Sequence, residues 1–412
     1  MRNRSTFTRR AVAAVAASAL IVAGCGGDDD SGDDTPAEPP ADTTAAEPPA
    51  DTTADTTADT TADTTDESDD GTVNEVAAAR VAAFLQPTTE LPFNEPVAME
   101  SGKKIFYVKC GVPVCEEIGT GVHSAAEAAG WTVEETSHQD TPDTVASAWD
   151  TALAAQPDVV MTSGNPRQWF ASQLAELEAQ GVPIITWSIA EPYEPGDGIN
   201  LNLLTEDDYH FYGMLAADYA TVTSTTKNIL FVGLPTFPVL STVQQGFNEE
   251  IAVACPDCSV KTIEVAVTDL GTNLPGMIVS ELQTNPDLDF VIYAFGGMLF
   301  GVPEAIEAAG LGDQAVAISQ AGGPLNFGYI AAGQHQVAEI ALASELLGWR
   351  AVDAAARIFA GDGPGRAETP AEDVVEGHPD ILASGLPVQI LEADSIADPA
   401  ALWPGVEGFQ EK

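Results

Sequence analysis

Residues 103–188 alternate between two patterns of hydrophobic and polar positions. Short apolar runs rich in β-branched residues begin near Lys104, Trp131, Asp158 and Val182, and a stretch with helical spacing separates each run from the next. Strands that alternate with helices at this pitch are typical of βαβ units in a parallel sheet. Ligands of such sheets bind beyond the carboxyl ends of the strands, which are expected here within 109–115, 163–166 and 187–193.

The same pattern restarts after a strand-like run at 199–204 and a helix expected from Thr205 to about Ala220. Strand-like runs then recur between helical patterns, at 228–233, 260–265, 289–294, 315–319, 335–340 and 385–393. A long helix is expected at 344–360. The chain therefore predicts an α/β fold with two doubly wound, parallel-sheet lobes.

Residues 1–25 have the pattern of an export signal. A start with four arginines precedes an apolar run that is too short for a stable membrane span, for which about 20 apolar residues are needed. The ending Val22-Ala23-Gly24-Cys25 looks like a bacterial lipobox, in which Cys25 is lipidated and becomes the mature N-terminus. The alternative is an ordinary secretory signal with a chance cysteine. We expect an extracytoplasmic protein that is anchored to the membrane by lipid and does not span it.

Residues 26–73 predict a disordered tether that is acidic and rich in threonine and proline. ADTT occurs five times and AEPP twice, and aromatic and large aliphatic residues are absent from 26–71. Such a segment has no core to offset the entropy of ordering. Sixteen of the acidic residues behind the net charge of −48 lie between Asp28 and Asp70. This acidity argues against nucleic acid as a partner, because phosphate binding needs clustered Lys and Arg.

Four further cysteines form two close pairs, Cys110 with Cys115 and Cys255 with Cys258. In an exported chain such pairs predict two disulfides, the first of which would brace a binding loop. Two other roles for these cysteines are a redox-active pair and a zinc site. A redox-active Cys255-Pro-Asp-Cys258 would need a helix N-terminus, and a four-cysteine zinc site would need both pairs to meet. The sequence contains no nucleophile elbow or phosphate loop, and we expect no metal, no cofactor and no enzymatic activity.

From about Lys103 to Ile390 the chain resembles type I periplasmic binding proteins of the ribose/sugar group, the solute-capturing components of ABC importers. The resemblance is carried by several strings together, which are TPDTVASAWDTAL…PDVVMTSG, LAELEAQGVPIITWS, the helix with Tyr209 and Gly213, Gln245-Gly246-Phe247, the helix from Met298 to Gly310, and Gly348-Trp349-Arg350-Ala351-Val352. It implies two Rossmann-like lobes, joined by a hinge, that close on one ligand. It also implies that lobe I comprises 74–192 with 336–376, and lobe II 193–335 with 377–412.

The chain departs from the sugar-binding pattern at three positions, and a Gln that is typical of the hinge region, near Ala341, is also missing. Phe295-Gly296 stands where an Asn-Asp pair is typical, Ser241 where an Arg is typical, and Ser319-Gln320-Ala321 where Gly-Phe-Asp is typical. A sugar needs such polar groups, because an unpaired buried hydroxyl costs about 1–3 kcal/mol. We therefore expect a solute that is less polar or more aromatic than a free monosaccharide. The candidate ligand contacts are Lys109, Ser163, Asn165, Trp187, Ser188, Tyr193, Phe237, Ser241, Phe295 and Gln320, and Trp169 and Phe300 complete the aromatic residues expected at the rim.

These patterns together predict a lipid-anchored, monomeric solute-binding protein that delivers a small molecule to an ABC permease. Two alternatives remain open at the level of sequence. One is a ligand-binding sensor that docks on a membrane receptor, and the other is an exported thiol oxidoreductase that uses Cys255 and Cys258.

Overall fold

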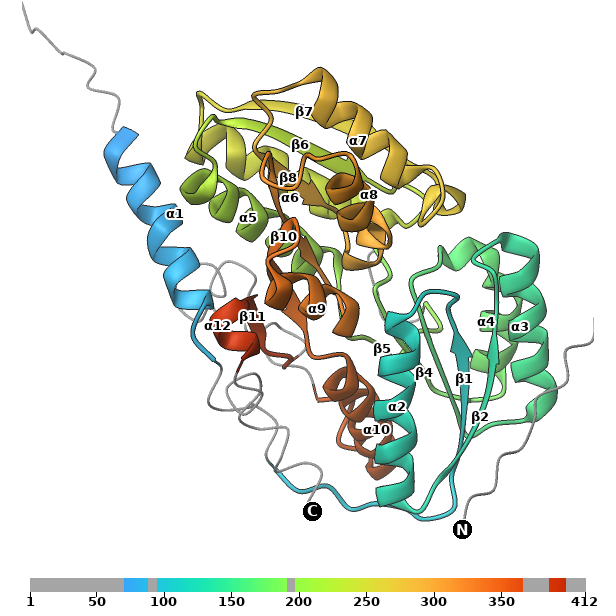
Figure 1. Cartoon of the computed structure of the whole chain (residues 1–412). Coiled ribbons are helices and arrows are strands. Elements are labelled where there is room, and N and C mark those ends of the chain that lie inside the picture. The colour runs from blue at the N-terminus through green and yellow to red at the C-terminus, as the bar shows by residue number, and fades with distance from the viewer. Residues whose placement is uncertain (1–69, 88–94, 191–196, 366–384, 398–412) are drawn as a thin grey trace, which may run out of the picture. The chain divides into compact units, whose positions relative to one another are not determined.

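The computed structural model describes residues 70–87, 95–190, 197–365 and 385–397 (Figure 1). The predicted signal, the lipidation site Cys25, nearly all of the predicted tether and the candidate contact Tyr193 lie outside the described residues.

The first sheet has five parallel strands in the order β2-β1-β3-β4-β5. Its strands are β1 (Lys104–Lys109), β2 (Thr132–Ser137), β3 (Val159–Ser163), β4 (Ile184–Trp187) and β5 (Leu201–Asn202). The connecting helices are α2 (Val114–Ala129), α3 (Pro142–Ala155), the 3-10 turn η1 (Arg167–Trp169) and α4 (Ala171–Ala179). All residues of β3 and β4 are buried, as expected for strands that are covered on both faces.

The second sheet has six strands in the order β11-β10-β9-β8-β6-β7, and only β11 is antiparallel to its neighbour. Its strands are β6 (Asn228–Gly233), β7 (Ser259–Glu264), β8 (Phe290–Tyr293), β9 (Val316–Gln320), β10 (Gln336–Leu342) and β11 (Val388–Glu392). The helices are α5 (Glu206–Thr223), α6 (Pro238–Ala254), α7 (Leu274–Thr284), α8 (Val302–Ala308), α9 (Pro324–Ala332) and α12 (Ala393–Ile396), with 3-10 turns η2 (Val267–Asp269) and η3 (Gly296–Leu299). The predicted fold class, two doubly wound lobes, is confirmed.

The chain passes between the sheets more than once. It leaves the first sheet after β5, and it returns after β10 to form α10 (Ser344–Ala360), which packs against α2 (Figure 1). The expected lobe I segment 336–376 is therefore divided in the structure. β10 pairs with β9 and β11 of the second sheet, and only α10 lies on the first. Periodicity identified the strand but could not identify its neighbours, because strand pairing is not local.

Helix α1 (Asp70–Phe84) also differs from the expected lobe boundaries, because it packs on elements of the second sheet and not of the first (Figure 1). Arg80 on α1 forms ion pairs with Asp218 of α5 at 2.7 Å and with Glu250 of α6 at 3.1 Å. The ring of Phe84 lies 5.1 Å from that of Phe211, between centroids. An apolar anchor and a shared arginine thus fix this helix to α5 and α6.

Two helix pairs approach closely through glycines on both partners. A Cβ atom on Gly121 of α2 would lie 2.0 Å from the carbonyl oxygen of Glu345, and one on Gly348 of α10 would lie 2.4 Å from that of Ile118. The α5–α6 pair uses Gly213 and Gly246 in the same way. Because no side chain fits between these backbones, the glycines set the distance of α10 from α2 and of α5 from α6.

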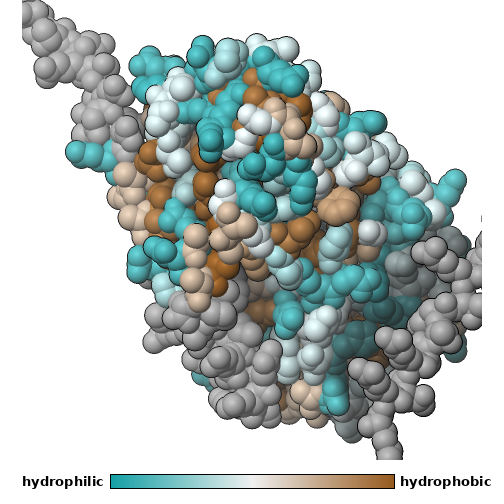
Figure 2. Space-filling view, viewed as in Figure 1, coloured by the Kyte–Doolittle hydropathy of each residue, from teal (hydrophilic) through white to brown (hydrophobic). Residues whose placement is uncertain are grey.

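Figure 2 shows hydrophilic residues over most of the visible described surface, in agreement with the acidic composition. The exposed large hydrophobic residues include Val76 on α1, Val222 on α5 and Val253 on α6. Within the described ranges, no helix combines the length and the apolar character needed to cross a membrane.

Candidate functional site

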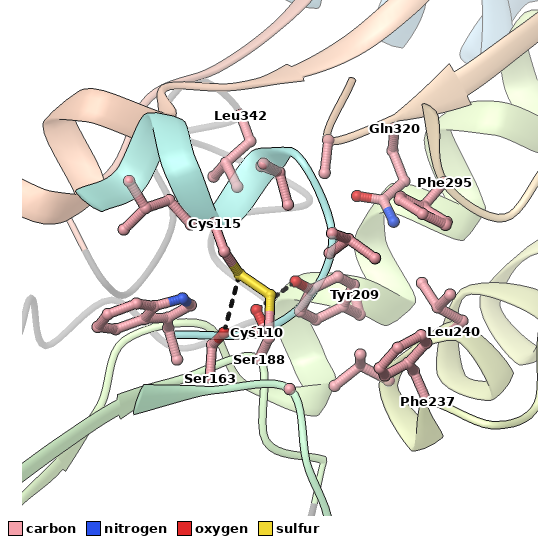
Figure 3. A pocket seen from close by; sticks show the side chains of 17 residues that line it. Cys110, Cys115, Ser163, Ser188, Tyr209, Phe237, Leu240, Phe295, Gln320 and Leu342 are labelled. Carbon is pink, nitrogen blue, oxygen red and sulfur yellow. Dashed lines mark hydrogen bonds between the residues drawn. A yellow bond between two sulfur atoms is a disulfide. The ribbon is translucent and has the colours of Figure 1, made fainter. Parts of the chain in front are cut away.

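A pocket lies where the loops that follow the strands of both sheets come together (Figure 3). In each sheet the strand order reverses between the first strand and the third, which are β1 and β3 in one and β6 and β8 in the other. Ligands of doubly wound sheets bind at the carboxyl ends of the strands at this switch point. The loops after these four strands supply Cys110, Gly164, Phe237 and Phe295 to the pocket. Topology and lining therefore identify the same site.

The wall from the first sheet is built around a disulfide. Cys110 follows β1 and is bonded to Cys115 in the first turn of α2. Ser163 at the end of β3 has its Oγ 3.5 Å from the Cys115 sulfur (Figure 3). Val112, within the closed loop, and Ile118 also line the pocket. The bridge holds a short apolar loop against the end of β3.

The wall from the second sheet is mainly aromatic and aliphatic. Phe237 caps the start of α6, and Phe295 precedes η3. Leu240 on α6 and Leu342 at the end of β10 extend this wall, while Gln320 at the end of β9 adds an amide (Figure 3). The pocket has a volume of about 80 Å³. One water needs roughly 10–15 Å³ by this measure, so there is room for several waters or a small solute.

The described residues that line the pocket include no charged side chain. Ser188, which follows β4, and Tyr209 of α5 share a hydrogen bond of 2.5 Å between their hydroxyls. Burial raises the pKa of Tyr209, so its hydroxyl remains protonated over the physiological range. The pocket is thus a largely apolar cavity with a few neutral polar groups, which is the usual composition of a small-molecule site.

Six of the candidate contacts are brought together in the pocket lining, namely Ser163, Trp187, Ser188, Phe237, Phe295 and Gln320. Their roles as ligand contacts remain predictions.

Three other candidates, Lys109, Ser241 and Asn165, lie outside the lining. The Lys109 ammonium is held by the carboxylates of Glu116 and Glu135 at 3.0 and 2.8 Å, because a charge without such partners would be costly beside an apolar cavity. Ser241 is exposed on α6, one residue beyond Leu240, since successive helix residues point in different directions.

Asn165 is the third candidate outside the lining, and it supports the disulfide loop. Its Nδ2 donates to Asp140 at 3.2 Å, and the other oxygen of Asp140 accepts from the backbone N–H of Gly111 at 3.0 Å. Burial alone raises the pKa of Asp140, but hydrogen bonds with His138 and Asn165 outweigh it and hold this pKa below its usual value. Asn165 therefore acts on the pocket through Asp140 and the loop after β1.

Sequence reasoning missed several lining residues, among them Tyr209, Leu240, Ala321 and Leu342. The position of Leu342 at the carboxyl end of a strand is a signal that could have identified it. Of the two other rim aromatics, Trp169 packs against the smaller core cluster of the first lobe, and Phe300 is exposed.

Two larger cavities, of about 210 and 310 Å³, lie elsewhere. The first is lined by residues that precede β4 and β5, and the second by residues at the starts of β6 and β7 and before β8. These are amino ends of strands, where doubly wound sheets do not bind their ligands. We therefore place the site at the smaller cavity.

Both predicted disulfides are present. Cys255 and Cys258 lie between the C-terminal end of α6 and β7, so neither has the helix N-terminus that would favour a reactive thiolate. No group of three or more metal-ligating side chains occurs within the part of the chain that the structure describes.

The family described as "Periplasmic binding protein domain" matches residues 108–363. This match spans more than half of the chain, and the chain belongs to that family. It is a type I periplasmic binding protein, and members of this class are carriers and not enzymes. The thiol oxidoreductase alternative is therefore not supported.

Solved structures share this fold. One is an ABC transporter solute-binding protein from Agrobacterium vitis bound with α-D-tagatopyranose, at 18% identity and a TM-score of 0.60, covering 73% of this chain and 97% of that one. GanP, a glucose-galactose binding protein from Geobacillus stearothermophilus, has 17% identity and a TM-score of 0.58, with coverage of 72% and 99%. The solute-binding protein of a 5-methylthioribose transporter from Thermotoga lettingae has 16% identity and a TM-score of 0.55, with coverage of 63% and 81%. No curated protein matches the chain.

Proposed function

We propose that the protein is a lipid-anchored, monomeric solute-binding protein of an ABC importer. It binds one small molecule, less polar than a free monosaccharide, in the pocket between the two sheets and delivers it to a membrane permease. The observation that carries this proposal is the meeting of both switch points at one apolar pocket. The lipobox-like residues 22–25 support the anchor.

The composition of the lining supports the class of solute. Charged and amide groups replace the hydration of a sugar in a protein site, whereas Phe237, Phe295, Leu240 and Leu342 supply mostly apolar contacts here. A sugar that carries an apolar substituent, or a flatter molecule, matches this lining better than a free hexose. The named ligands of the related structures range from tagatopyranose and glucose to 5-methylthioribose, so the fold accepts solutes of different polarity.

Thermal unfolding of the full chain with a panel of small solutes tests the function. A true solute stabilises the folded state by RT ln(1 + [L]/Kd), about 2.7 kcal/mol at one hundred times Kd. Phe237→Ala and Phe295→Ala should each weaken binding about tenfold or more, because burying a phenylalanine is worth about 1.5–3 kcal/mol.

Phe300→Ala is the matched control, because Phe300 is 59% exposed and does not line the pocket. It should leave the affinity unchanged. If Phe237→Ala and Phe295→Ala both bind a confirmed solute as tightly as the native chain, the site lies elsewhere.

A further inference from the structure

Two polar atoms of the pocket lining have no hydrogen-bond partner among the described residues. They are the Oε1 of Gln320 and the Nε1 of Trp187. Both residues are buried, with 2% of Gln320 and 1% of Trp187 exposed. Nearly all buried polar groups are paired, and an unpaired one costs about 1–3 kcal/mol. Both residues line the pocket, so a guest that takes the place of water there would supply the missing partners.

The contacts around these atoms fix what each needs. The Nε2 of Gln320 donates to the carbonyl oxygen of Ala294 at 2.8 Å. Because a carbonyl only accepts, the amide cannot be turned around, and Oε1 is left as an acceptor. The indole Nε1–H of Trp187 only donates. A complementary guest therefore has a donor for Gln320 and an acceptor for Trp187.

Lack of a partner does not by itself mark a site. Trp149 Nε1 and Gln389 Oε1 are also buried and unpaired, and neither residue lines the pocket. Gln320 and Trp187 differ from them because both line one cavity, at the carboxyl ends of β9 and β4, with one from each sheet. A single guest in this cavity can therefore donate to Gln320 and accept from Trp187, and it would contact both lobes.

The other side-chain polar groups of the lining are few and partly engaged. The hydroxyls of Ser188 and Tyr209 share one hydrogen bond of 2.5 Å, and Ser163 lies 3.5 Å from the sulfur of Cys115. A charged solute would meet no opposite charge on the described lining, and most hydroxyls of a free sugar would be buried without partners. The guest is therefore uncharged and has few polar groups.

We propose that Gln320 and Trp187 make the site selective for a small uncharged cyclic amide or a nitrogen heterocycle of similar shape. Its N–H donates to Gln320 Oε1, its carbonyl oxygen accepts from Trp187 Nε1–H, and the apolar lining holds the ring. This inference rests on the proposed solute-binding function and specifies the chemistry of its solute.

Titration calorimetry on the full chain tests the selectivity, with uracil, hypoxanthine and 2-pyrrolidone as probes. Their counterparts methylated on every ring N–H, glucose and ribose serve for comparison. We expect at least one N–H amide to bind, and its N-methylated form to bind about tenfold more weakly. In Gln320→Met this difference should disappear, because the acceptor is gone. Trp187→Phe should weaken the parent and the methylated amide alike, because both keep the carbonyl.

Gln389→Met and Trp149→Phe are matched controls that remove the same groups from buried sites outside the pocket. Both should keep the native affinity and the native preference for the N–H form. Unfolding midpoints of all four variants show whether each is folded, so a loss of binding confined to Gln320→Met and Trp187→Phe reflects recognition.

The inference is overturned if the N-methylated and parent amides bind equally, if Gln320→Met keeps the preference, or if the pocket binds only a free sugar or a charged solute. After any of these outcomes, the proposed solute-binding function is still supported if mass spectrometry of the purified protein finds a bound molecule. If no probe binds and no molecule co-purifies, the proposed function fails together with the inference.

Discussion

At the scale of single residues, a buried carboxyl group organises the loop that carries Gln320. Glu339 on β10 is completely buried and accepts hydrogen bonds from Ser319 Oγ, from the backbone N–H of Gly322 at 2.5 Å and from Gln336 Nε2 at 2.6 Å. Burial raises the pKa of Glu339 to about 7. The group thus holds both ends of the segment 319–322 and titrates near neutral pH.

This carboxyl predicts a pH dependence of stability. In the unfolded chain the glutamate ionises near pH 4.5, whereas in the folded chain it keeps its proton until about pH 7. This raised pKa adds at most about 3 kcal/mol to the free energy of unfolding below pH 4.5, and this stabilisation is lost as the pH rises to about 7. The stability of Glu339→Gln should not fall in this pH range for this reason, because glutamine does not titrate. Denaturant unfolding of both chains at pH 5 and pH 8 measures it, and an identical change in the two would refute the assignment.

At the scale of elements, the glycine contacts between α2 and α10 decide how the returning chain meets the first sheet. Gly121→Ala places a methyl group 2.0 Å from the backbone oxygen of Glu345, a clash that no rotamer change relieves. We expect a loss of about 2 kcal/mol or more in the free energy of unfolding.

Gly276→Ala in α7 is the control, because a Cβ there meets nothing within 4 Å. It should leave stability unchanged or raise it by about 0.4–1 kcal/mol, since alanine loses less backbone entropy than glycine in a helix. Equal effects of the two substitutions in denaturant titrations would show that the α2–α10 contact is not close.

The two disulfides predict equal effects on stability and different effects on binding. Each closes a short loop, so replacing either pair by serines should cost about 2 kcal/mol. Only the Cys110–Cys115 bridge lines the pocket, so only its loss should weaken solute binding, by about tenfold. Calorimetry on the Cys110→Ser/Cys115→Ser and Cys255→Ser/Cys258→Ser chains measures the solute affinity of each. Equal affinities would show that the Cys110–Cys115 bridge does not contribute to solute binding.

At the scale of the whole molecule, two sheets whose five parallel strands follow the same order present their switch points to a single pocket. Two of the segments that pass between the sheets lie after β5 and after β10, and the chain passes back to the second sheet between α10 and β11. Trp187 and Leu342 line the pocket close to these passages. If the lobes close on a solute as the resemblance implies, a change in the angle between them would alter the lining, and contacts made only in the closed form would select that form.

The tether should contribute nothing to the fold or to the site. A chain that begins at Asp70 lacks the acidic repeats but keeps α1 with its Arg80 contacts. We expect its unfolding midpoint and its solute affinity to equal those of the full chain, because 26–69 contain no aromatic or large aliphatic side chain to bury. A drop of several degrees in the midpoint would mean that the repeats pack on the folded part.

Periodicity located the elements well. The strand expected at 228–233 and the helix expected at 344–360 have the bounds of β6 and α10. It placed candidate contacts less well, because position after a strand does not fix the direction of a side chain. Phe237 and Phe295 line the pocket, whereas Lys109 and Asn165, which also follow or end strands, turn to carboxylates nearby.

The sequence by itself determined the order of strands and helices, the two local disulfides and the mostly apolar, aromatic composition of the loops that form the pocket, because each depends on residues that are close along the chain. The tertiary structure alone decided that β10 joins the second sheet, that α1 packs on α5 and α6, and that Gln320 and Trp187 share one cavity. Pairing and burial depend on partners that are not neighbours along the chain, as far as 138 residues for Arg80 and Asp218, and no local pattern records them.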